Sequence, residues 1–376
     1  MVQLSLSSLR ISHFRTHKLS VIEPTQEPIV IFGLNGAGKT NILEAISMFA
    51  PGQGFRRAKI SDLSRRPELL GWKLTGKFNI FDQSYEIIIS WDEALGRKIK
   101  IDGKSVTQSK LARLIRILWI TPMMDRIWLN GSAERRRFLD RIASNLVPDH
   151  TENSVKYYKA LKQRNKLLKD RVLDSNWYDA VENQMALSAI EINKGRGEAI
   201  SSIMEMQKKS VSSFPAADLN LVGPQHLLVQ DFQSVLFGSR KQDMHFGRTL
   251  IGPHLSDLGA IYSSKGIEAK NCSTGEQKAL LISIIIATAK IQLEKFNVPP
   301  ILLFDEVSAH LDIERRADLY AEICNLDLQI FMTGTDSIIF NGLEDRAKYY
   351  EIVMNMQESM CIPIEDPQFK NIQKQF

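Results

Sequence analysis

The stretch Gly33–Thr40 reads GLNGAGKT and is the part of the chain that decides its fold. It follows the apolar run Ile29–Phe32 and precedes a helix-like segment, Asn41–Ile46. A glycine-rich loop between a strand and a helix is the setting of a phosphate-binding loop. The glycines let backbone N–H groups point at phosphate oxygens, and the helix N-terminus adds a favourable field for an anion. The stretch therefore predicts a nucleotide site.

Two side chains of this loop have predicted roles of their own. Lys39 reaches the β- and γ-phosphates of a nucleotide, and the Thr40 hydroxyl ligates Mg²⁺. A glycine-rich turn also serves as a plain connector in many proteins, but the full motif with both flanking elements favours ATP binding. The predicted nucleotide contacts of the loop are Gly33, Asn35, Gly36, Gly38, Lys39, Thr40 and Asn41.

A second group of motifs lies far along the chain. Asn271–Lys278 reads NCSTGEQK and resembles the signature segment of ABC-type ATPases. The run Ile301–Phe304 has the character of a buried parallel strand, and it ends in the acidic pair Asp305 and Glu306. Each motif is weak evidence alone, but their order excludes small GTPases and nucleoside kinases. We expect Asp305 to hold Mg²⁺ and Glu306 to orient and deprotonate the attacking water.

Resemblance to ABC-type ATPases implies a site that two subunits share. In those proteins the signature segment contacts the γ-phosphate of ATP bound to the opposite subunit, and here Ser273 and Gly275 stand at those positions. The segment Ser308–Asp312 matches the D-loop, so Asp312 is a further expected nucleotide contact. ATP would then hold two subunits together, and its hydrolysis would release them.

Composition limits the class of protein. A chain of 376 residues allows two or three domains and a sizeable core. Its three cysteines lie far apart, which suggests a reducing compartment. The longest apolar stretch, Ala279–Ala289, is too short to span a bilayer, and the first residues lack the apolar core of a signal peptide. We therefore expect a cytoplasmic protein with no membrane partner.

The distribution of charge says more than the net charge of +5. Basic residues crowd Arg56–Arg66 and Arg135–Arg137, and five lysines between Lys156 and Lys169 are spaced by three or four. On a helix these lysines share one face. A solvated face is the ordinary interpretation of any one cluster, but several clusters in one ATPase favour a polyanion partner.

The pattern along the chain indicates an α/β protein. Residues 4–32 predict short strands that lead into the phosphate loop, and alternating residues in Trp72–Ile80, Tyr85–Trp91 and Lys98–Ile101 predict an attached antiparallel sheet, with a hairpin turn at Asp102 and Gly103. Residues 133–213 are poor in proline and glycine and predict a helical insertion of three or four helices. Phe214–Gln242 looks irregular. The predicted domains are 1–120 plus 245–376, forming an ATPase head, and 121–244, forming an inserted helical lobe.

With these pieces placed, the chain resembles the RecF family of bacterial recombination mediators, which is related to SMC-type heads. The resemblance rests on Asn130–Asp140, which reads NGSAERRRFLD, and on Tyr158–Lys169, which reads YKALKQRNKLLK. Gly54–Arg56 also matches a family segment. His13–His17 resembles the Phe-Arg element of SMC-like heads, whose arginine, Arg15 here, approaches the phosphates.

The resemblance implies an ABC-type, SMC-like ATPase head with ATP and Mg²⁺ as cofactors. It further implies an ATP-dependent homodimer that binds double-stranded DNA and single-strand/double-strand junctions in replication, DNA repair and the SOS response. Slow, DNA-stimulated ATP hydrolysis and loading of the recombinase RecA, with RecO and RecR as partners, follow from the same resemblance. The residues expected to contact DNA are Arg56, Arg57, Arg65, Lys159, Lys162 and Lys166.

The chain departs from the family pattern at two places. Leu255 stands where the family usually has an arginine, and no switch histidine follows Phe331–Thr335, where Thr335 is the candidate substitute. Two other functions stay open: an ATPase subunit of a transporter, and a scaffold whose dimer state ATP sets without hydrolysis. The basic helical insertion argues against the transporter, and Glu306 argues against the scaffold.

Overall fold

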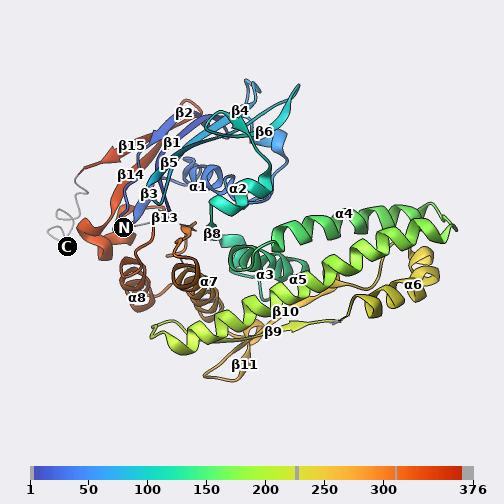
Figure 1. Ribbon diagram of the computed structural model, residues 1–376. Helices are drawn as coiled ribbons and strands as arrows, with labels where there is room; N and C mark the ends of the chain where they lie inside the picture. The colour runs from blue at the N-terminus through green and yellow to red at the C-terminus, as the bar shows by residue number, and fades with distance from the viewer. Residues whose placement is uncertain (1–3, 225–227, 310, 366–376) are drawn as a thin grey trace. The chain divides into compact units, whose positions relative to one another are not determined.

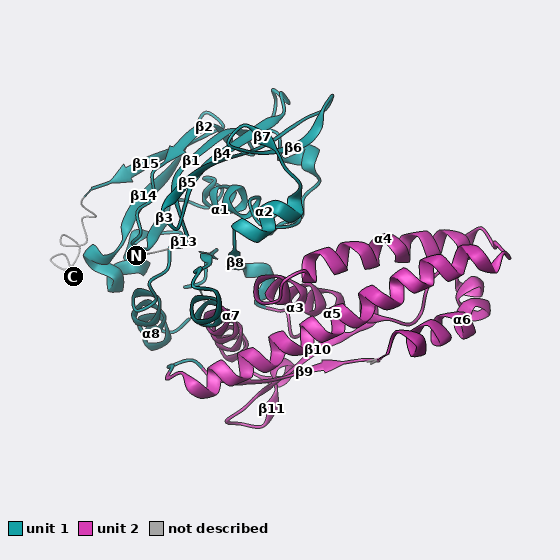
Figure 2. Ribbon diagram, viewed as in Figure 1, with its two compact units in different colours: residues 1–125, 212–214, 289–376 teal, residues 126–211, 215–288 magenta. Residues whose placement is uncertain are grey.

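The computed structural model describes residues 4–224, 228–309 and 311–365. Contacts divide the chain into two compact units (Figure 2). Unit 1 contains residues 1–125, 212–214 and 289–376, and unit 2 contains residues 126–211 and 215–288. The D-loop residue His310 lies outside the described residues. Among the residues that are described, no helix is long and apolar enough to cross a membrane.

Unit 1 contains a mostly parallel sheet in the order β15-β14-β3-β13-β12-β8. All neighbouring pairs are parallel except β14 with β15. Because β3 lies between β13 and β14, the phosphate loop leaves from the interior of the sheet. The strands are β3 (Ile29–Phe32), β8 (Ile117–Ile120), β12 (Ile301–Phe304), β13 (Ile330–Gly334), β14 (Lys348–Asn355) and β15 (Glu358–Ile364).

The second sheet of unit 1 is antiparallel, in the order β2-β1-β4-β5-β6-β7. It confirms the predicted strands, and Asp102 and Gly103 form the predicted turn between β6 and β7. Helix α1 (Lys39–Ser47), labelled in Figure 1, is buried along nearly its whole length. The core around it takes side chains from both sheets. The strands are β1 (Leu4–Phe14), β2 (His17–Ile22), β4 (Trp72–Ile80), β5 (Gln83–Asp92), β6 (Gly96–Ile101) and β7 (Lys104–Ser105).

Unit 1 also contains α2 (Gln108–Leu114) and α8 (Ile313–Cys324), with short 3-10 turns between the larger elements. Helix α7 (Thr274–Phe296) begins in unit 2 and ends in unit 1. It contains the predicted apolar stretch Ala279–Ala289 and ends before Pro299, where the sequence predicted a break.

Three helices of unit 2 lie within the segment predicted to be a helical insertion, and they confirm its helical character. They are α3 (Ser132–Leu146), α4 (His150–Lys169) and α5 (Ser175–Lys209). The long helix α5 packs against the other two and against α6 (Val229–Phe246). A three-stranded antiparallel sheet completes the unit: β9 (Ala217–Val222), β10 (Asp257–Tyr262) and β11 (Ile267–Glu268).

The prediction that Phe214–Gln242 is irregular was wrong, because β9 and most of α6 occupy this segment. In β9 the buried residues Ala217 and Leu219 alternate with polar residues, which is the pattern of a short half-buried strand. In α6 the buried residues Phe232 and Leu236 are four apart, so one turn of helix separates them. The polar stretch Ser239–Asp243 that follows them hid this period in the sequence.

The two units differ from the predicted domains mainly in residues 245–288, which fall in unit 2. Strand β10 pairs with β9 and packs against α3, and these contacts hold the segment in unit 2. The division into functional domains at 120/121 and 244/245 stays a prediction.

Helix α4 separates a buried face from a basic one. Tyr157, Leu161 and Leu168 are buried, as their spacing predicted. The lysines of the opposite face are exposed, and we call them the α4 lysine face: Lys156, Lys159, Lys162, Lys166 and Lys169.

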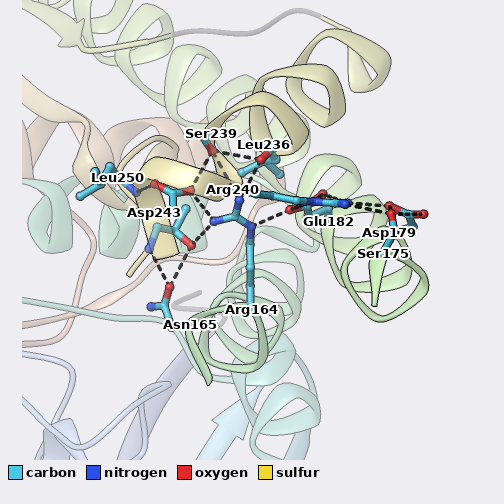
Figure 3. Close-up of polar contacts among 11 residues, drawn as sticks. Arg164, Asn165, Ser175, Asp179, Glu182, Leu236, Ser239, Arg240, Asp243 and Leu250 are labelled. Atoms are coloured by element: carbon cyan, nitrogen blue, oxygen red, sulfur yellow. Dashed lines mark hydrogen bonds and ion pairs between the residues drawn. The ribbon is translucent and has the colours of Figure 1, made fainter. Parts of the chain in front are cut away.

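On its buried side, α4 contributes a fully buried arginine to an ionic network (Figure 3). Arg164 donates from Nε to Glu182 of α5 at 2.8 Å and from Nη1 to Asp243 of α6 at 2.6 Å. Arg240 joins the same network through Glu182, at 2.6 Å. Arg164 also donates to the Thr249 hydroxyl at 2.8 Å and to the Leu236 carbonyl at 2.8 Å. One guanidinium thereby connects three helices.

Replacing Arg164 by Ala is expected to lower the free energy of unfolding of unit 2 by about 3–5 kcal/mol, because the buried Asp243 loses its cation and Glu182 keeps only Arg240. Urea denaturation followed by the circular dichroism of the helices measures the change. Lys162→Ala, on the exposed face of the same helix, is the control and should change the midpoint little. Equal midpoints for the two variants would show that the network contributes nothing to stability.

Candidate functional site

The phosphate loop adopts a backbone that only glycine tolerates at two positions. Gly33 has φ +147°, and a Cβ there would lie 2.3 Å from the Ile352 carbonyl oxygen. Gly38 has φ +108°, and a Cβ there would lie 2.3 Å from Ser359 Oγ. Both the torsion angles and the close neighbours therefore exclude a side chain. By contrast, Gly36 has open space around it.

Lys39 lies folded over the loop. Its Nζ donates to the carbonyl oxygens of Gly33 at 2.8 Å and Leu34 at 3.0 Å. Burial lowers the pKa of the ammonium group, and the charges of Glu306 and Asp305 act in the opposite direction. The cation is thus held at the loop, at the position where the motif predicts contact with phosphates.

The acidic pair meets the loop at the carboxyl end of the parallel sheet. Thr40 Oγ1 donates to Asp305 Oδ1 at 2.9 Å. Thr333, at the end of β13, donates from its hydroxyl to the same oxygen at 2.8 Å. Its Oγ1 accepts the backbone N–H of Glu306 at 2.9 Å. The buried Thr333 thereby connects the two acidic residues.

The chemistry of this group fits a Mg²⁺ ion. Burial raises the pKa of the Asp305 carboxyl, while hydrogen bonds from Thr333 and Thr40 oppose the shift. A buried carboxylate whose described bonds come from neutral hydroxyls favours a cation, and Mg²⁺ prefers such hard oxygen ligands. Within the described residues no cluster of three or more His, Cys, Asp or Glu could hold a metal ion. Thr40 and Asp305 therefore suit an ion that takes its other ligands from water and phosphates.

Two arginines meet on one carboxylate beside the loop. Glu44 of α1 is fully buried and accepts from Arg15 Nε at 2.8 Å and Nη2 at 2.7 Å. Arg56 Nη1 lies 3.4 Å from the same carboxylate and donates to Asn41 Oδ1 at 3.0 Å. The two guanidiniums are thus tied to α1, immediately after the phosphate loop, by one buried acid.

The signature segment belongs to unit 2, and its serine caps helix α7. Ser273 donates from its backbone N–H and from its hydroxyl to Glu276 Oε2, each at 2.8 Å. Lys265 pairs with the other oxygen of Glu276. These bonds, that of Lys265 first, lower the pKa of Glu276 to about 2. Ser273 itself is exposed, as a contact to another molecule requires.

The structure brings together only part of the predicted site. Lys39 bonds the Gly33 carbonyl, and Thr40 bonds Asp305. Asn41 donates its backbone N–H to the Gly38 carbonyl, and Arg15 pairs with Glu44 of α1. Asn35 and Gly36 are exposed on the loop. Glu306 directly follows Asp305. Asp312 caps α8 by accepting the Arg315 N–H at 2.8 Å. Ser273 and Gly275 lie in the other unit.

The predicted DNA contacts separate into three groups. Lys159, Lys162 and Lys166 are exposed on α4, and Arg57 is exposed as well. Arg56 is exposed, but its guanidinium donates to Asn41 of α1. Arg65 is 6% exposed, pairs with Glu68 and donates to the Gln357 carbonyl at 3.2 Å. Its burial leaves little of Arg65 open to solvent, and its contact with DNA stays a prediction.

Several residues of the site were not predicted from the sequence. Glu44 is an acid within the otherwise apolar stretch Ile42–Ile46, which is a usable signal of a buried ion pair. Thr333 ends a strand that runs parallel to the Asp305 strand, so the topology predicts their proximity once the strand order is known. The sequence pattern marks Thr16 and His17 only as neighbours of Arg15, with no role of their own. Ser359 lies in a C-terminal hairpin and has no signal in the sequence.

Comparisons with known proteins agree with this geometry. A family model described as the RecF/RecN/SMC N terminal domain matches residues 5–359. The DNA replication and repair protein RecF of Mesorhizobium japonicum is 37% identical over 93% of this chain and 96% of its own length. The protein of the same name from Rhizobium johnstonii is 37% identical over 93% of this chain and 97% of its own.

Solved structures share the fold. The recombination mediator protein RecF with ATP, described as part of the RecFOR pathway, aligns with a TM-score of 0.81 at 21% identity, over 97% of this chain and 100% of that one. An Smc head domain derived from Pyrococcus furiosus aligns with a TM-score of 0.57 at 18% identity, over 96% of each chain. These matches confirm the predicted α/β, ABC-type and SMC-like head. With 37% identity to RecF relatives over nearly the whole chain, this protein belongs to the RecF family, within the RecF/RecN/SMC N-terminal domain group.

Proposed function

We propose that this protein is a cytoplasmic ATP-dependent DNA-binding protein of replication and recombinational repair. It dimerises when it binds ATP, holds double-stranded DNA beside single-strand gaps, and helps RecO and RecR to load the recombinase RecA. The observation that carries the nucleotide part is the arrangement at the end of the parallel sheet: Lys39 bonds the carbonyls of the phosphate loop, and Thr40 and Thr333 both donate to Asp305. The relatives named as DNA replication and repair proteins support the DNA part.

In the proposed reaction Lys39 binds the phosphates, and Glu306 takes a proton from the attacking water. Thr40 and Asp305 would hold Mg²⁺, which supplies neutralisation of the phosphate charge when it is bound. Thr333 holds the Asp305 carboxylate and the Glu306 backbone in place. Arg15 and Arg56, both tied to Glu44, add positive charge beside the phosphates. Hydrolysis is slow and stimulated by DNA in this proposal.

The exposed signature serine supports ATP-dependent dimerisation. Ser273 stands at the start of α7, where its hydroxyl and the helix N-terminus can both meet an anion. In the proposed dimer, Ser273 and Gly275 contact the γ-phosphate on the opposite subunit, and Asp312 of the D-loop lies near the same interface. The chain aligns with the named RecF proteins over nearly their full length, and this argues against the transporter alternative.

DNA binding is expected to depend on the α4 lysine face. Replacing Lys159, Lys162 and Lys166 by Glu should weaken DNA binding and flatten the log–log salt dependence by up to about one unit per lost phosphate contact. Fluorescence anisotropy with a gapped duplex, measured across a salt series, gives this slope. ATP affinity should stay unchanged, since the lysines belong to unit 2 and Lys39 to unit 1.

The matched control reverses Lys98, Lys100 and Lys104, which are exposed on β6 and β7 in unit 1. It makes the same change in net charge, so it removes any general electrostatic effect from the comparison. If both triple variants show the native slope, the DNA lies elsewhere, and Arg57 becomes the next residue to reverse.

A further inference from the structure

Side chains from outside the phosphate loop bond its backbone. His17, at the start of β2, is fully buried, and its Nε2 lies 3.1 Å from the Gly38 carbonyl oxygen. Ser359 of β15 is also fully buried, and its Oγ lies 2.6 Å from the Ala37 carbonyl oxygen. Two consecutive carbonyls of the loop are therefore bonded from two different strands.

The same two strands meet each other beside the loop. Ser359 donates its backbone N–H to the Thr16 carbonyl at 3.0 Å, and the two hydroxyls lie 2.6 Å apart. Asn41 Nδ2 donates to Thr16 Oγ1 at 2.8 Å. The Ser359 hydroxyl has one proton and two acceptors within reach, Thr16 Oγ1 and the Ala37 carbonyl oxygen, and the carbonyl can only accept.

The protonation of His17 follows from its neighbours. The Gly38 carbonyl can only accept, so Nε2 carries a proton. Nδ1 lies 2.8 Å from Ser20 Oγ and accepts the proton of that hydroxyl when the ring is neutral. Burial lowers the pKa of His17, while the bond to Gly38 and the charge of Glu358 oppose this shift. The neutral ring with its proton on Nε2 therefore fits both contacts.

The direction of a carbonyl decides the direction of the next amide. A trans peptide is planar, so its C=O and the following N–H point to opposite sides. The Ala37 carbonyl points to Ser359, and the Gly38 N–H consequently points away from it. The Gly38 carbonyl points to His17, and the Lys39 N–H points away in the same manner. These are two of the amides that a phosphate-binding loop turns toward its anion.

We propose that His17 and Ser359 are positioning residues, which bond the Ala37 and Gly38 carbonyls and so aim the Gly38 and Lys39 amides at the nucleotide phosphates. Neither side chain touches the nucleotide in this arrangement. The inference rests on the nucleotide site proposed above. It adds that the site is completed by the turn between β1 and β2 and by the C-terminal hairpin of β14 and β15.

Close packing around Gly38 supports the positioning role of Ser359. A Cβ on Gly38 would lie 2.3 Å from Ser359 Oγ and 2.8 Å from Thr16 Oγ1. The two hydroxyls thus occupy the space that a side chain at Gly38 would need. The glycine and its neighbours form one packed unit, and the loop cannot turn its carbonyls inward without breaking these bonds.

The test compares ADP binding by the native protein and by variants of the full chain. Ser359→Ala removes one oxygen from a buried site and should raise the Kd for ADP about tenfold, which corresponds to about 1.4 kcal/mol. In ATP hydrolysis KM should rise while kcat at saturating ATP changes little, because the residue acts on binding through the loop. Isothermal titration calorimetry gives Kd, and a phosphate-release assay gives KM and kcat.

Tyr350→Phe is the matched control. Tyr350 lies in the same hairpin and donates its hydroxyl to the Glu23 carbonyl at 2.8 Å, so the change also removes a bond between a hydroxyl and a backbone carbonyl. It should lower the thermal midpoint about as much as Ser359→Ala does and leave the Kd for ADP at the native value. An equal rise in Kd for both variants would reduce the role of Ser359 to general stability.

Variants of His17 test the same proposal independently. His17→Leu removes the donor to Gly38 and should raise the Kd for ADP, whereas His17→Gln keeps an N–H donor and should restore most of the affinity. Native Kd values for both Ser359→Ala and His17→Leu would overturn the inference. Failure of the native protein itself to bind ADP would instead overturn the proposed nucleotide function, so the two failures are distinct.

Discussion

Glu306→Gln should slow ATP hydrolysis by about 10²–10⁴-fold and leave ATP binding intact, because a general base contributes a factor of this size. The amide has the shape of the carboxylate but cannot take a proton from water. The backbone of Glu306 is held by its N–H bond to Thr333, with φ at +49°, so the substitution leaves the chain in place. The loss should therefore appear in the chemical step alone.

Single-turnover release of phosphate measures that step directly. Light scattering on the same samples should show an ATP-bound dimer that persists longer than the native one. Glu314→Gln, which neutralises an exposed acid of α8 in the same unit, is the control and should hydrolyse ATP normally. A native rate of phosphate release from Glu306→Gln would rule out Glu306 as the base.

Lys39→Met should abolish tight ATP binding, and dimerisation should be lost with it. Methionine has a similar length but no charge, so the β- and γ-phosphates lose their nearest cation. The Gly33 and Leu34 carbonyls also lose the bonds that Nζ supplies. Calorimetry with ATP measures the binding, and light scattering measures the dimer. If the Lys39→Met protein dimerises on ATP like the native protein, ATP bound at this site does not hold the dimer together.

Ser273→Arg separates binding from dimerisation. The arginine would stand where the phosphate of the opposite subunit must dock, so this variant should bind ATP as a monomer and fail to dimerise. Mixed with Lys39→Met subunits, it can complete at most one composite site per dimer. Two working sites in that mixture would rule out action of Ser273 across the interface.

Local patterns predicted most of the head. The phosphate loop, the Asp305 strand and the antiparallel sheet each carry a short-range signal: glycines at set spacings, an apolar run before an acid, or alternating residues. The helical insertion was visible from composition. Polar residues concealed α6, since only two apolar positions one turn apart, Phe232 and Leu236, mark its buried face.

The part of the site that could not be predicted from the sequence depends on side-chain contacts between residues that are distant along the chain. Arg56 was assigned to DNA because it lies in a basic cluster, yet its guanidinium donates to Asn41. Arg65 belongs to the same cluster and is buried. A run of like charges shows where cations are concentrated but not which way each side chain turns. That direction is set by tertiary partners such as Glu44 for Arg56 and the Gln357 carbonyl for Arg65.

The bond network around Gly38 also has a consequence for the order in which the protein matures. Thr16 and Ser359 are 343 positions apart, although their hydroxyls touch. Synthesis proceeds from the N-terminus, and contacts between such distant residues close late. The phosphate loop emerges from the ribosome early, but the Ala37 carbonyl has no partner until the C-terminal hairpin has been made. A nascent chain therefore carries an unfinished nucleotide pocket, and on our proposal its affinity for nucleotide rises once translation has passed Ser359.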